Sequence, residues 1–271
     1  MKLEGCGASI FLKMNRLLIS ISVLVLVLSC QDQSKKEKVE TNDKSNHWSY
    51  QGETGPEHWA ELEDNSNCNG NFQSPINLVN YKVAEDLEPI DLHYSEKTIL
   101  HDVANNGHSI QYDFERGDFL IHKEDTFHLK QFHFHEPAEH LIEGVRYPLE
   151  IHLVHQNESK EFVVLSVMAK EGNNSKPFEL LESYLPIQKG EMKLIQRPFD
   201  ISQNLPQNRG YFSYQGSLTT PPCSEKVTWI VFKQAIEVSL EQVELLKYLM
   251  PINNYRDEQP HHGRAVYSTS F

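Results

Sequence analysis

Two histidines separated by a single residue, His133 and His135, lie in the stretch from residue 131 to residue 140. This stretch begins by alternating polar and aromatic residues, which is the pattern of a β-strand with two distinct faces. Gln131 and both histidines would then share one face, and the intervening phenylalanines would pack on the other. Two imidazoles on a rigid strand begin a metal site but do not complete it, because zinc in proteins takes at least three protein ligands.

A third histidine is expected from residues 147–155, which also have the composition of a strand. Glu150, His152 and Val154 would share one of its faces. A glycine and a proline separate the two stretches, so the chain can turn back and pair them antiparallel, with His152 across from the first two histidines. Three neutral imidazoles with a fourth position left for water are typical of a catalytic rather than a structural zinc site.

Polar side chains are available to orient these rings. Gln131 and Glu150 each precede a histidine by two residues on the same face, where they could accept a hydrogen bond from the second ring nitrogen. The competing interpretation is that a His-x-His pair on a strand is ordinary surface histidine. The third histidine, with a carboxylate on its own face, favours the metal site over that alternative.

Length and charge limit the classes of protein that remain. A chain of 271 residues can bury one large core or two small ones, and its composition is that of a soluble globular protein. The formal net charge is −13 and no basic stripe offsets it, which argues against a nucleic acid as partner. Nothing in the pattern specifies an oligomeric state.

Residues 1–30 have the organisation of a secretory signal peptide. Lys13 and Arg16 precede an apolar run from residue 17 to residue 28, and a serine and Cys30 follow it. The run is short for a membrane span, which needs about 20 residues. Residues 27–30, Val-Leu-Ser-Cys, also resemble a bacterial lipobox, in which Cys30 would be acylated and become the first mature residue. An ordinary signal peptide with an incidental cysteine is the alternative.

Residues 31–45 are polar and charged and contain no aromatic residue, so we expect a disordered tether between a lipid anchor and a folded domain at 46–271. The predicted location is the periplasm or cell envelope, with the anchor as the sole membrane contact. Met14 would be a more typical start of the signal than Met1, and N-terminal mapping of the primary translation product would test that hypothesis.

The cysteines suggest one bridge. Cys6 and Cys30 belong to the leader, which leaves Cys68 and Cys223 in the predicted domain. In an exported protein two cysteines most simply form one disulfide, and two buried free thiols are the alternative. A bridge over so long a loop would contribute on the order of 4–5 kcal/mol in the chain-entropy model.

From residue 46 onward no linker, repeat or low-complexity segment interrupts the chain, so we expect one domain. Alternating runs predict strands at 90–94, 109–114, 118–122, 127–134, 149–155, 162–169 and 226–232. Residues 163–168 are nearly all apolar, which is typical of a central strand. Helices are expected at 178–185 and at 239–249, where Ser239 and Gln242 have capping-box spacing. Many strands and few short helices indicate a β-rich α+β domain.

Three further segments contain residues suited to a site, although each alone is an ordinary turn or loop. They are Asn-Asn-Gly-His at 105–108, Ser-Leu-Thr-Thr-Pro-Pro-Cys at 217–223 and Asn-Asn-Tyr-Arg at 253–256. Together with the histidine strands they carry a resemblance to α-class carbonic anhydrases, which runs through essentially all of residues 47–271. Other matching motifs are Gly-Pro-Glu-His-Trp at 55–59, Gln-Ser-Pro-Ile-Asn at 73–77, Glu-His at 139–140, Glu-Ile-His-Leu-Val-His at 150–155 and Val-Thr-Trp at 227–229.

The resemblance implies one domain around a large twisted, mostly antiparallel sheet, with Zn²⁺ at the bottom of a cone-shaped cleft. It assigns three metal ligands, which are His133, His135 and His152. It also assigns three residues that hold those rings in place, which are Gln131, Glu150 and Asn254.

The resemblance further implies that Thr219 accepts a hydrogen bond from zinc-bound hydroxide while donating its own proton to Glu139. The Thr219 amide and the Thr220 side chain would contact bicarbonate. Tyr50 would help to hold a water chain leading to His108, the proton shuttle. The apolar wall for carbon dioxide would consist of Val154, Val164, Leu218, Val227 and Trp229. The pair Cys68 and Cys223 matches a disulfide of exported members.

The implied activity is zinc-dependent, reversible hydration of carbon dioxide to bicarbonate and a proton, by attack of zinc-bound hydroxide and histidine proton shuttling. One rival is a silent binding protein on the same scaffold, but such proteins commonly lack a zinc histidine and this chain has all three. A second rival is a zinc hydrolase of a larger substrate. It would need a carboxylate facing the metal-bound water, whereas Glu139 is expected to reach Thr219.

Two departures from the family pattern, Glu136 and Ala138, are not expected to touch the metal. His140 and His155 are expected to make structural hydrogen bonds within the sheet. His261 and His262, in the C-terminal tail, are expected to be exposed to solvent.

Overall fold

The computed structural model describes residues 48–62 and 66–271 of the chain. The predicted signal peptide, with Cys30, and the predicted tether at 31–45 lie outside the described residues. The described part belongs to one compact unit. None of its helices combines the length and the apolar character that a membrane crossing requires.

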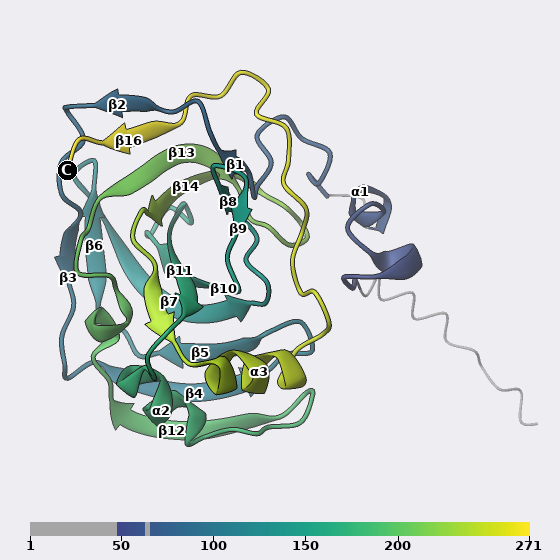
Figure 1. The fold of residues 1–271 in the computed structure, drawn as a ribbon, viewed down its shortest axis with the longest axis vertical. Coiled ribbons are helices and arrows are strands. Elements are labelled where there is room, and N and C mark those ends of the chain that lie inside the picture. The colour runs from purple at the N-terminus through teal and green to yellow at the C-terminus, as the bar shows by residue number, and fades with distance from the viewer. Residues whose placement is uncertain (1–47, 63–65) are drawn as a thin grey trace, which may run out of the picture. The chain divides into compact units, whose positions relative to one another are not determined.

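A large sheet forms the centre of this unit (Figure 1). Ten strands follow one another across it in the order β12 (Met192–Pro198), β4 (Ile99–Asn105), β5 (Ile110–Phe114), β7 (Asp125–His135), β10 (Leu149–Gln156), β11 (Phe162–Glu171), β14 (Glu225–Phe232), β13 (Tyr211–Ser217), β16 (Tyr267–Thr269) and β2 (Lys82–Ala84). Three more strands complete it: β15 (Ile236–Val238) pairs with β11, β6 (Phe119–His122) with β7, and β3 (Asp91–His93) with β6.

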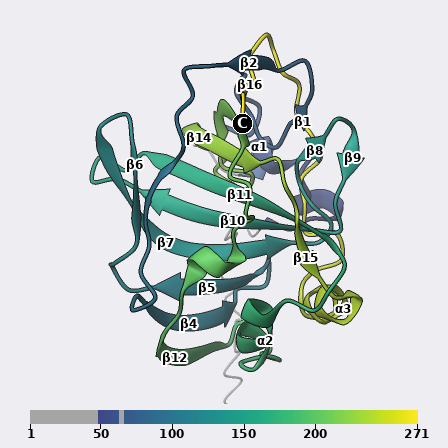
Figure 2. The same ribbon diagram turned by 60° about the vertical axis from the view of Figure 1, so that its left-hand side comes forward.

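Within this large sheet most neighbouring strands are antiparallel, and its parallel pairs are β11 with β14, β11 with β15 and β16 with β2. Figure 2 shows the strands from β12 to β11 side by side and progressively turned. The expectation of a large twisted, mostly antiparallel sheet is therefore confirmed. A second, three-stranded sheet contains β1 (Asn77–Leu78), β8 (Leu141–Ile142) and β9 (Val145–Arg146).

The described residues contain three short α-helices, α1 (Trp59–Leu62), α2 (Lys176–Glu182) and α3 (Leu240–Leu249), and two 3₁₀ helices, Gly52–Thr54 and Ile201–Asn204. The predicted capping box is present at α3, where the side chains of Ser239 and Gln242 each accept a hydrogen bond from the other's backbone N–H. The helix predicted at 178–185 starts earlier, because Pro177 is well suited to its first turn, and ends before Pro186 is reached.

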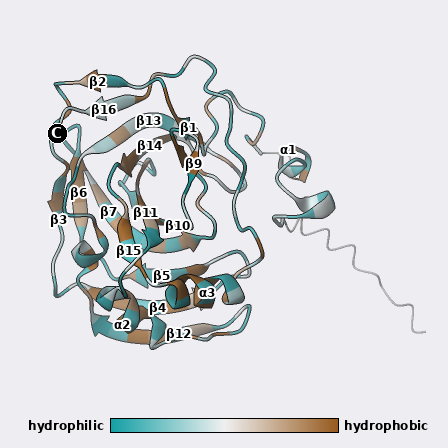
Figure 3. Cartoon of the chain, viewed as in Figure 1, coloured by the Kyte–Doolittle hydropathy of each residue, from teal (hydrophilic) through white to brown (hydrophobic). Residues whose placement is uncertain are grey.

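Alternation of side chains along the strands separates two layers of apolar residues. Phe132, Phe134 and Leu165 belong to the large core on one face of the sheet. Val154 and Val164 belong to a smaller cluster on the other face. Figure 3 shows hydrophobic residues recurring along the strands and polar residues concentrated in the loops. The predicted division of β7 into a phenylalanine face and a histidine face follows from this arrangement.

Each of the predicted strands is present, with ends displaced by at most about two residues, within the usual uncertainty of strand limits. Residues 163–169 of β11 are all buried between β10 and β14, as expected of a central strand. The prediction missed β4, β12 and β13, together with several very short strands.

Candidate metal centre

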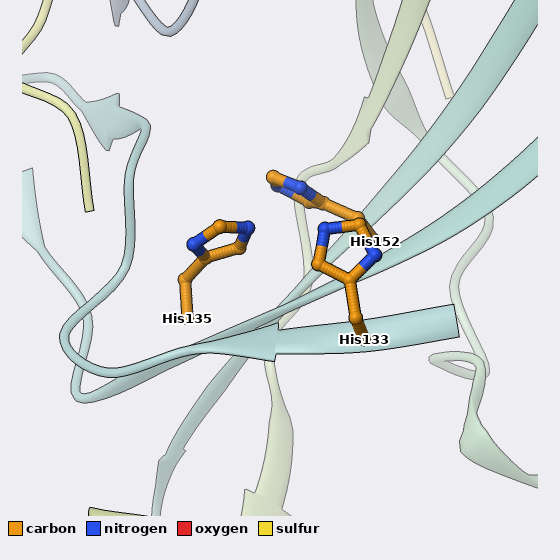
Figure 4. Close-up of side chains that lie close together, drawn as sticks. All are labelled: His133, His135 and His152. Atoms are coloured by element: carbon orange, nitrogen blue, oxygen red, sulfur yellow. The ribbon is translucent and has the colours of Figure 1, made fainter. Parts of the chain in front are cut away.

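The pairing of β7 with β10 brings three histidines together. His152 lies directly opposite His133 in the antiparallel register, and Glu150 lies opposite His135. One nitrogen of each of the three rings lies within 4.8 Å of the others. Figure 4 shows the rings converging from the two strands. The structure therefore assembles the set that the sequence predicted.

Two of these rings are held by side chains on their own strands. His133 Nδ1 donates to Gln131 Oε1 at 2.9 Å, and His152 Nε2 donates to Glu150 Oε1 at 2.7 Å. An oxygen acceptor requires a proton on the nitrogen that it faces, so the opposite nitrogen presents a lone pair. The predicted supporting positions of Gln131 and Glu150 are those that the structure shows.

The third ring depends on the C-terminal part of the chain. His135 Nδ1 donates to the backbone carbonyl of Asn254 at 2.6 Å. The Asn254 side chain accepts from the Glu136 N–H at 2.7 Å and donates to the carbonyls of Phe134 and His108 at 2.9 and 3.0 Å. One residue thus ties the end of β7 to the turn that contains His108.

The surroundings keep the three imidazoles neutral. His135 and His152 are each only 1% exposed. Burial lowers the pKa of His135 to about 4 and also lowers the pKa of His152. Burial, together with repulsion from the other two rings, holds the pKa of His133 well below its usual range. Neutral imidazoles are the form that binds a metal, so no proton has to be displaced at neutral pH.

The donor set fits zinc. His135 Nε2 is buried and has no hydrogen-bond partner within residues 48–62 and 66–271. This nitrogen and those of two other neutral imidazoles match the donors of a three-histidine zinc site, in which further positions remain for water or substrate.

Glu150 supports the centre through five hydrogen bonds. Its Oε1 accepts from His140 Nδ1, His152 Nε2 and Ser166 Oγ at 2.7, 2.7 and 2.6 Å. Its Oε2 accepts from the N–H groups of Glu139 and His140 at 2.7 and 2.8 Å. Although burial raises the pKa of Glu150, His140 and His152 hold it well below its usual range. The cluster of His140, Glu150 and His152 is therefore a hydrogen-bonded support rather than a second metal site.

Glu139 lies beside the centre and contacts the loop residue expected to act with it. Its Oε2 is 3.4 Å from His135 Nε2 and 3.8 Å from His152 Nδ1, and its Oε1 accepts from the Arg256 N–H at 2.9 Å. Burial raises the pKa of Glu139 to about 7, while His152 and a hydrogen bond from Thr219 lower it. The structure thus brings Glu139 and Thr219 together next to the histidines.

The apolar residues predicted to form a wall gather against His152. Four of them lie in one buried cluster and the fifth packs on it: Val154, Val164, Val227, Trp229 and Leu218. The Trp229 ring meets the His152 ring edge-on, with centroids 4.8 Å apart. Trp229 Nε1 donates to the Ser217 carbonyl at 2.9 Å, which fixes the indole at the start of the loop that follows β13.

The predicted disulfide between Cys68 and Cys223 is confirmed and joins residues 155 positions apart. The Cys223 N–H donates to the Thr220 carbonyl at 2.8 Å. On the other side of the bridge, the Arg256 guanidinium donates to the Cys68 carbonyl at 2.7 Å. The bridge therefore anchors the short loop that carries Thr219 and Thr220.

His108 lies in the turn between β4 and β5. Its ring stacks on Trp48, with centroids 3.7 Å apart and planes inclined by 15°. The Tyr50 ring is 6.4 Å from it. Burial, and secondarily Glu139, holds the pKa of Tyr50 well above its usual range, so its hydroxyl keeps its proton at neutral pH. The structure places Tyr50 near His108 and adds Trp48, which sequence reasoning did not identify.

Sequence reasoning also missed a chain of hydroxyls behind the centre. His140 Nε2 lies 2.6 Å from the Tyr214 hydroxyl, which lies 2.9 Å from Ser74 Oγ, and Ser74 Oγ accepts from the Ser217 N–H at 3.1 Å. The chain connects the Glu150 support to the loop after β13. Only the alternation of residues 211–217, in a strand that was itself missed, could have pointed to Tyr214.

Three other histidines test the remaining expectations. His155 is buried and hydrogen-bonded within the sheet, as expected. His262 is exposed, as expected, but the expectation that His261 is exposed is wrong. It is half-buried and donates to the Asn77 carbonyl at 2.7 Å, because the tail folds back, with Gln259 N–H bonded to the Pro75 carbonyl at 2.8 Å.

A large antiparallel sheet that presents three neutral imidazoles is typical of a metal-binding enzyme, and comparison with known proteins identifies the family. The description of eukaryotic-type carbonic anhydrases matches residues 54–270. A carbonic anhydrase of Klebsiella pneumoniae is 39% identical over 227 residues, which cover 82% of this chain and 91% of that protein. The chain therefore belongs to the eukaryotic-type, or α-class, carbonic anhydrase family.

Solved structures agree on the fold. An alpha-carbonic anhydrase from Thermovibrio ammonificans, in complex with the inhibitor sulfanilamide, is 39% identical with a TM-score of 0.78, covering 82% of this chain and 98% of that one. Dioscorin, in complex with ascorbate, is 30% identical with a TM-score of 0.76, covering 82% and 97%. Because differently named proteins share the fold, the site residues have to carry the functional argument.

Proposed function

We propose that this protein catalyses the reversible hydration of carbon dioxide to bicarbonate and a proton, with Zn²⁺ held by His133, His135 and His152. The observation that carries the proposal is the convergence of three neutral imidazoles, each fixed through its second nitrogen. Membership of the carbonic anhydrase family supports the same activity. When bound, zinc supplies a nucleophile near neutral pH by lowering the pKa of a water ligand to about 7, a value that belongs to carbonic anhydrases in general.

Thr219 and Glu139 would select what binds beside the imidazoles. Because the Thr219 hydroxyl gives its hydrogen to the Glu139 carboxyl, its oxygen remains as an acceptor. An acceptor at this position favours a ligand atom that carries a hydrogen. Bicarbonate has one hydroxyl and so meets that requirement, and the Thr219 amide and the Thr220 side chain would contact its other oxygens.

The apolar wall suits the other substrate. Carbon dioxide is small, uncharged and without a net dipole, so van der Waals contact holds it better than hydrogen bonds do. Such contacts would come from Val154, Val164, Leu218, Val227 and Trp229. The edge-on contact between Trp229 and His152 keeps this wall next to the reacting position.

Tyr50 and His108 would carry the proton away. Tyr50 keeps its own proton at neutral pH, so it can hold water by hydrogen bonding without acting as a base. Histidine exchanges a proton near neutral pH, so His108 can pass one to a buffer.

Stopped-flow measurement of carbon dioxide hydration, before and after removal of zinc with a chelator, tests the proposal. Activity that disappears with zinc and returns when zinc is added back would support enzyme and metal together. A folded, zinc-loaded protein without hydration activity would contradict the proposal and favour a binding role, and dioscorin in complex with ascorbate would then be the relevant comparison.

We also propose that the enzyme works in the periplasm or cell envelope, attached through an acylated Cys30. The Val-Leu-Ser-Cys pattern at 27–30 supports this, and a disulfide such as Cys68–Cys223 is of the kind that persists in oxidising compartments. Metabolic labelling with palmitate should mark the wild-type protein and not Cys30→Ser. Equal labelling of both would contradict the anchor.

A further inference from the structure

His108 lines a cavity of about 270 Å³ whose other walls include Tyr50, Gly107 and Lys189. The described residues of this lining carry one formal positive charge, on Lys189, and no carboxylate. The whole chain has a formal net charge of −13, so the charge of this cavity is opposite to that of the protein as a whole.

A neighbouring cavity has the opposite charge. It has a volume of about 490 Å³ and also includes Tyr50 in its wall. Three carboxylates, from Glu53, Glu57 and Asp257, line it, and neither lysine nor arginine is among its described lining residues. A small anion that approaches this part of the surface is repelled by the acidic cavity and attracted to the one that contains Lys189. The two cavities, which share Tyr50, therefore favour ions of opposite charge, and His108 lines the one that favours anions.

Backbone contacts fix Lys189 relative to the turn of His108. The N–H of Gly190, the next residue, donates to the Asn105 carbonyl at 2.7 Å. Asn105 Oδ1 accepts from the Gly107 N–H at 3.1 Å. One asparagine thus holds both the loop of Lys189 and the turn that leads into His108.

The side chain of Lys189 then passes over the glycine of that turn. A Cβ placed at Gly107 would lie 2.5 Å from Lys189 Cε and 3.3 Å from Nζ. Gly107 also has a φ of +84°, which other residues rarely adopt. The bare glycine therefore allows the lysine to lie against the residue that precedes His108.

We propose that this cavity binds the small oxyanion that takes the proton from His108, and that Lys189 attracts it. The inference rests on the proposed function. The ligand class is a dianionic oxyanion base such as hydrogen phosphate. In the transfer, the protonated His108 ring gives its N–H proton to a phosphate oxygen, so the ring becomes neutral and the dianion becomes a monoanion. The ring has then lost its charge and the anion carries one charge fewer, while Lys189 is unchanged, so the attraction is weaker and release of the product is favoured.

Proton transfer to buffer, measured by oxygen-18 exchange between carbon dioxide and water at fixed low ionic strength, tests this inference. Lys189→Gln should lower the second-order rate constant for phosphate about two- to fivefold, the size expected of one exposed charge pair, and Lys189→Glu should lower it further. The constant for imidazole, an uncharged base, and kcat/KM for carbon dioxide should not change. Lys97→Gln removes an exposed lysine that lines neither cavity and is the matched control.

An unchanged phosphate constant in both Lys189 variants, or an equal loss with phosphate and imidazole, would overturn the inference. A second measurement does not need turnover: the NMR signals of the His108 ring are followed while phosphate is added. A saturable shift in the wild type that is lost in Lys189→Glu supports the site, and no shift in the wild type refutes it. A saturable shift in a protein that hydrates no carbon dioxide would refute the proposed function and leave the anion site standing.

Discussion

Four histidines of this protein lie in two environments, which suit the two opposite roles proposed for them. His133, His135 and His152 come from paired strands, and each has its second nitrogen fixed by an oxygen acceptor and its pKa lowered. His108 comes from a turn, stacks on Trp48 and lines a cavity. A metal ligand must not take up a proton, whereas a proton shuttle must. The surroundings of the ring, not the residue type, separate the two tasks.

Removing one of the three proposed zinc ligands should have the largest effect on activity. His135→Ala removes one of three ligands, so zinc content should fall and carbon dioxide hydration should drop by on the order of 10⁴-fold or more. Stopped-flow kinetics and atomic absorption measure the two losses. His155→Gln, at a buried histidine outside the set, should keep its zinc, and equal zinc loss in both variants would point to unfolding instead.

Weakening the hydrogen bonds that Glu150 accepts should have a smaller effect. Glu150→Gln replaces a carboxylate that accepts five hydrogen bonds with a neutral amide, so the dissociation constant for zinc should rise about 10- to 100-fold. Competition with a chromophoric chelator measures it. Ser166→Ala removes one of the five donors and should change the affinity less. An unchanged affinity in Glu150→Gln would show that the carboxylate does not fix His152.

Removing His108 should leave zinc binding unchanged and slow proton transfer. His108→Ala should reduce turnover in weak buffer roughly tenfold or more while leaving kcat/KM unchanged, because only regeneration of the active form needs the shuttle. Added imidazole should restore the rate. Trp48→Phe, which keeps an aromatic ring for stacking, should stay near the wild type. A rate in His108→Ala that does not depend on buffer would remove His108 from this role.

The buried histidines should also make the metal-free protein sensitive to acid. Burial lowers the pKa of His155 to about 3, so between the unfolded value near 6.5 and that pH the unfolded chain binds a proton that the folded chain excludes. Stability should therefore be lost as the pH falls below about 6.5, by up to about 1.4 kcal/mol per pH unit from this group. Urea unfolding of the chelator-treated protein at several pH values measures the slope, which should be shallower in His155→Gln. An unaltered slope would mean that other groups dominate.

Strand prediction succeeded where burial leaves a period in the sequence. β7 and β10 have two dissimilar or fully buried faces, so alternation and apolar runs mark them. β12 has one buried residue, Ile195, and lies at the edge of the sheet, so little of its sequence is constrained by the core. In β4, the polar residues His101 and Asp102 interrupt the apolar pattern, because the strand buries the Asp102 carboxylate, which pairs with the His101 ring. The edge position weakens the pattern of β12, and the buried polar pair weakens that of β4, which lies inside the sheet.

The site was predictable to the extent that its contacts are local. Gln131 and Glu150 lie two residues from their histidines, so the strand period alone places them. The acceptor for His135 is the main-chain carbonyl of Asn254, 119 residues away, and any residue type has such a carbonyl. The family resemblance, and not spacing, pointed to Asn254. The stacking of Trp48 on His108 likewise depends on how distant segments pack.

Because the chain is synthesised from its N-terminus, the position of Asn254 determines when the His135 ring can be fixed. His135 is made 119 residues before the carbonyl that fixes its ring, and the Arg256 N–H that binds Glu139 is made later still. A chain that ends before residue 254 contains all three proposed metal ligands and yet lacks the carbonyl that fixes the His135 ring. The proposed metal centre therefore gains its complete hydrogen-bonded support only when the C-terminal segment has been made and has folded against β7.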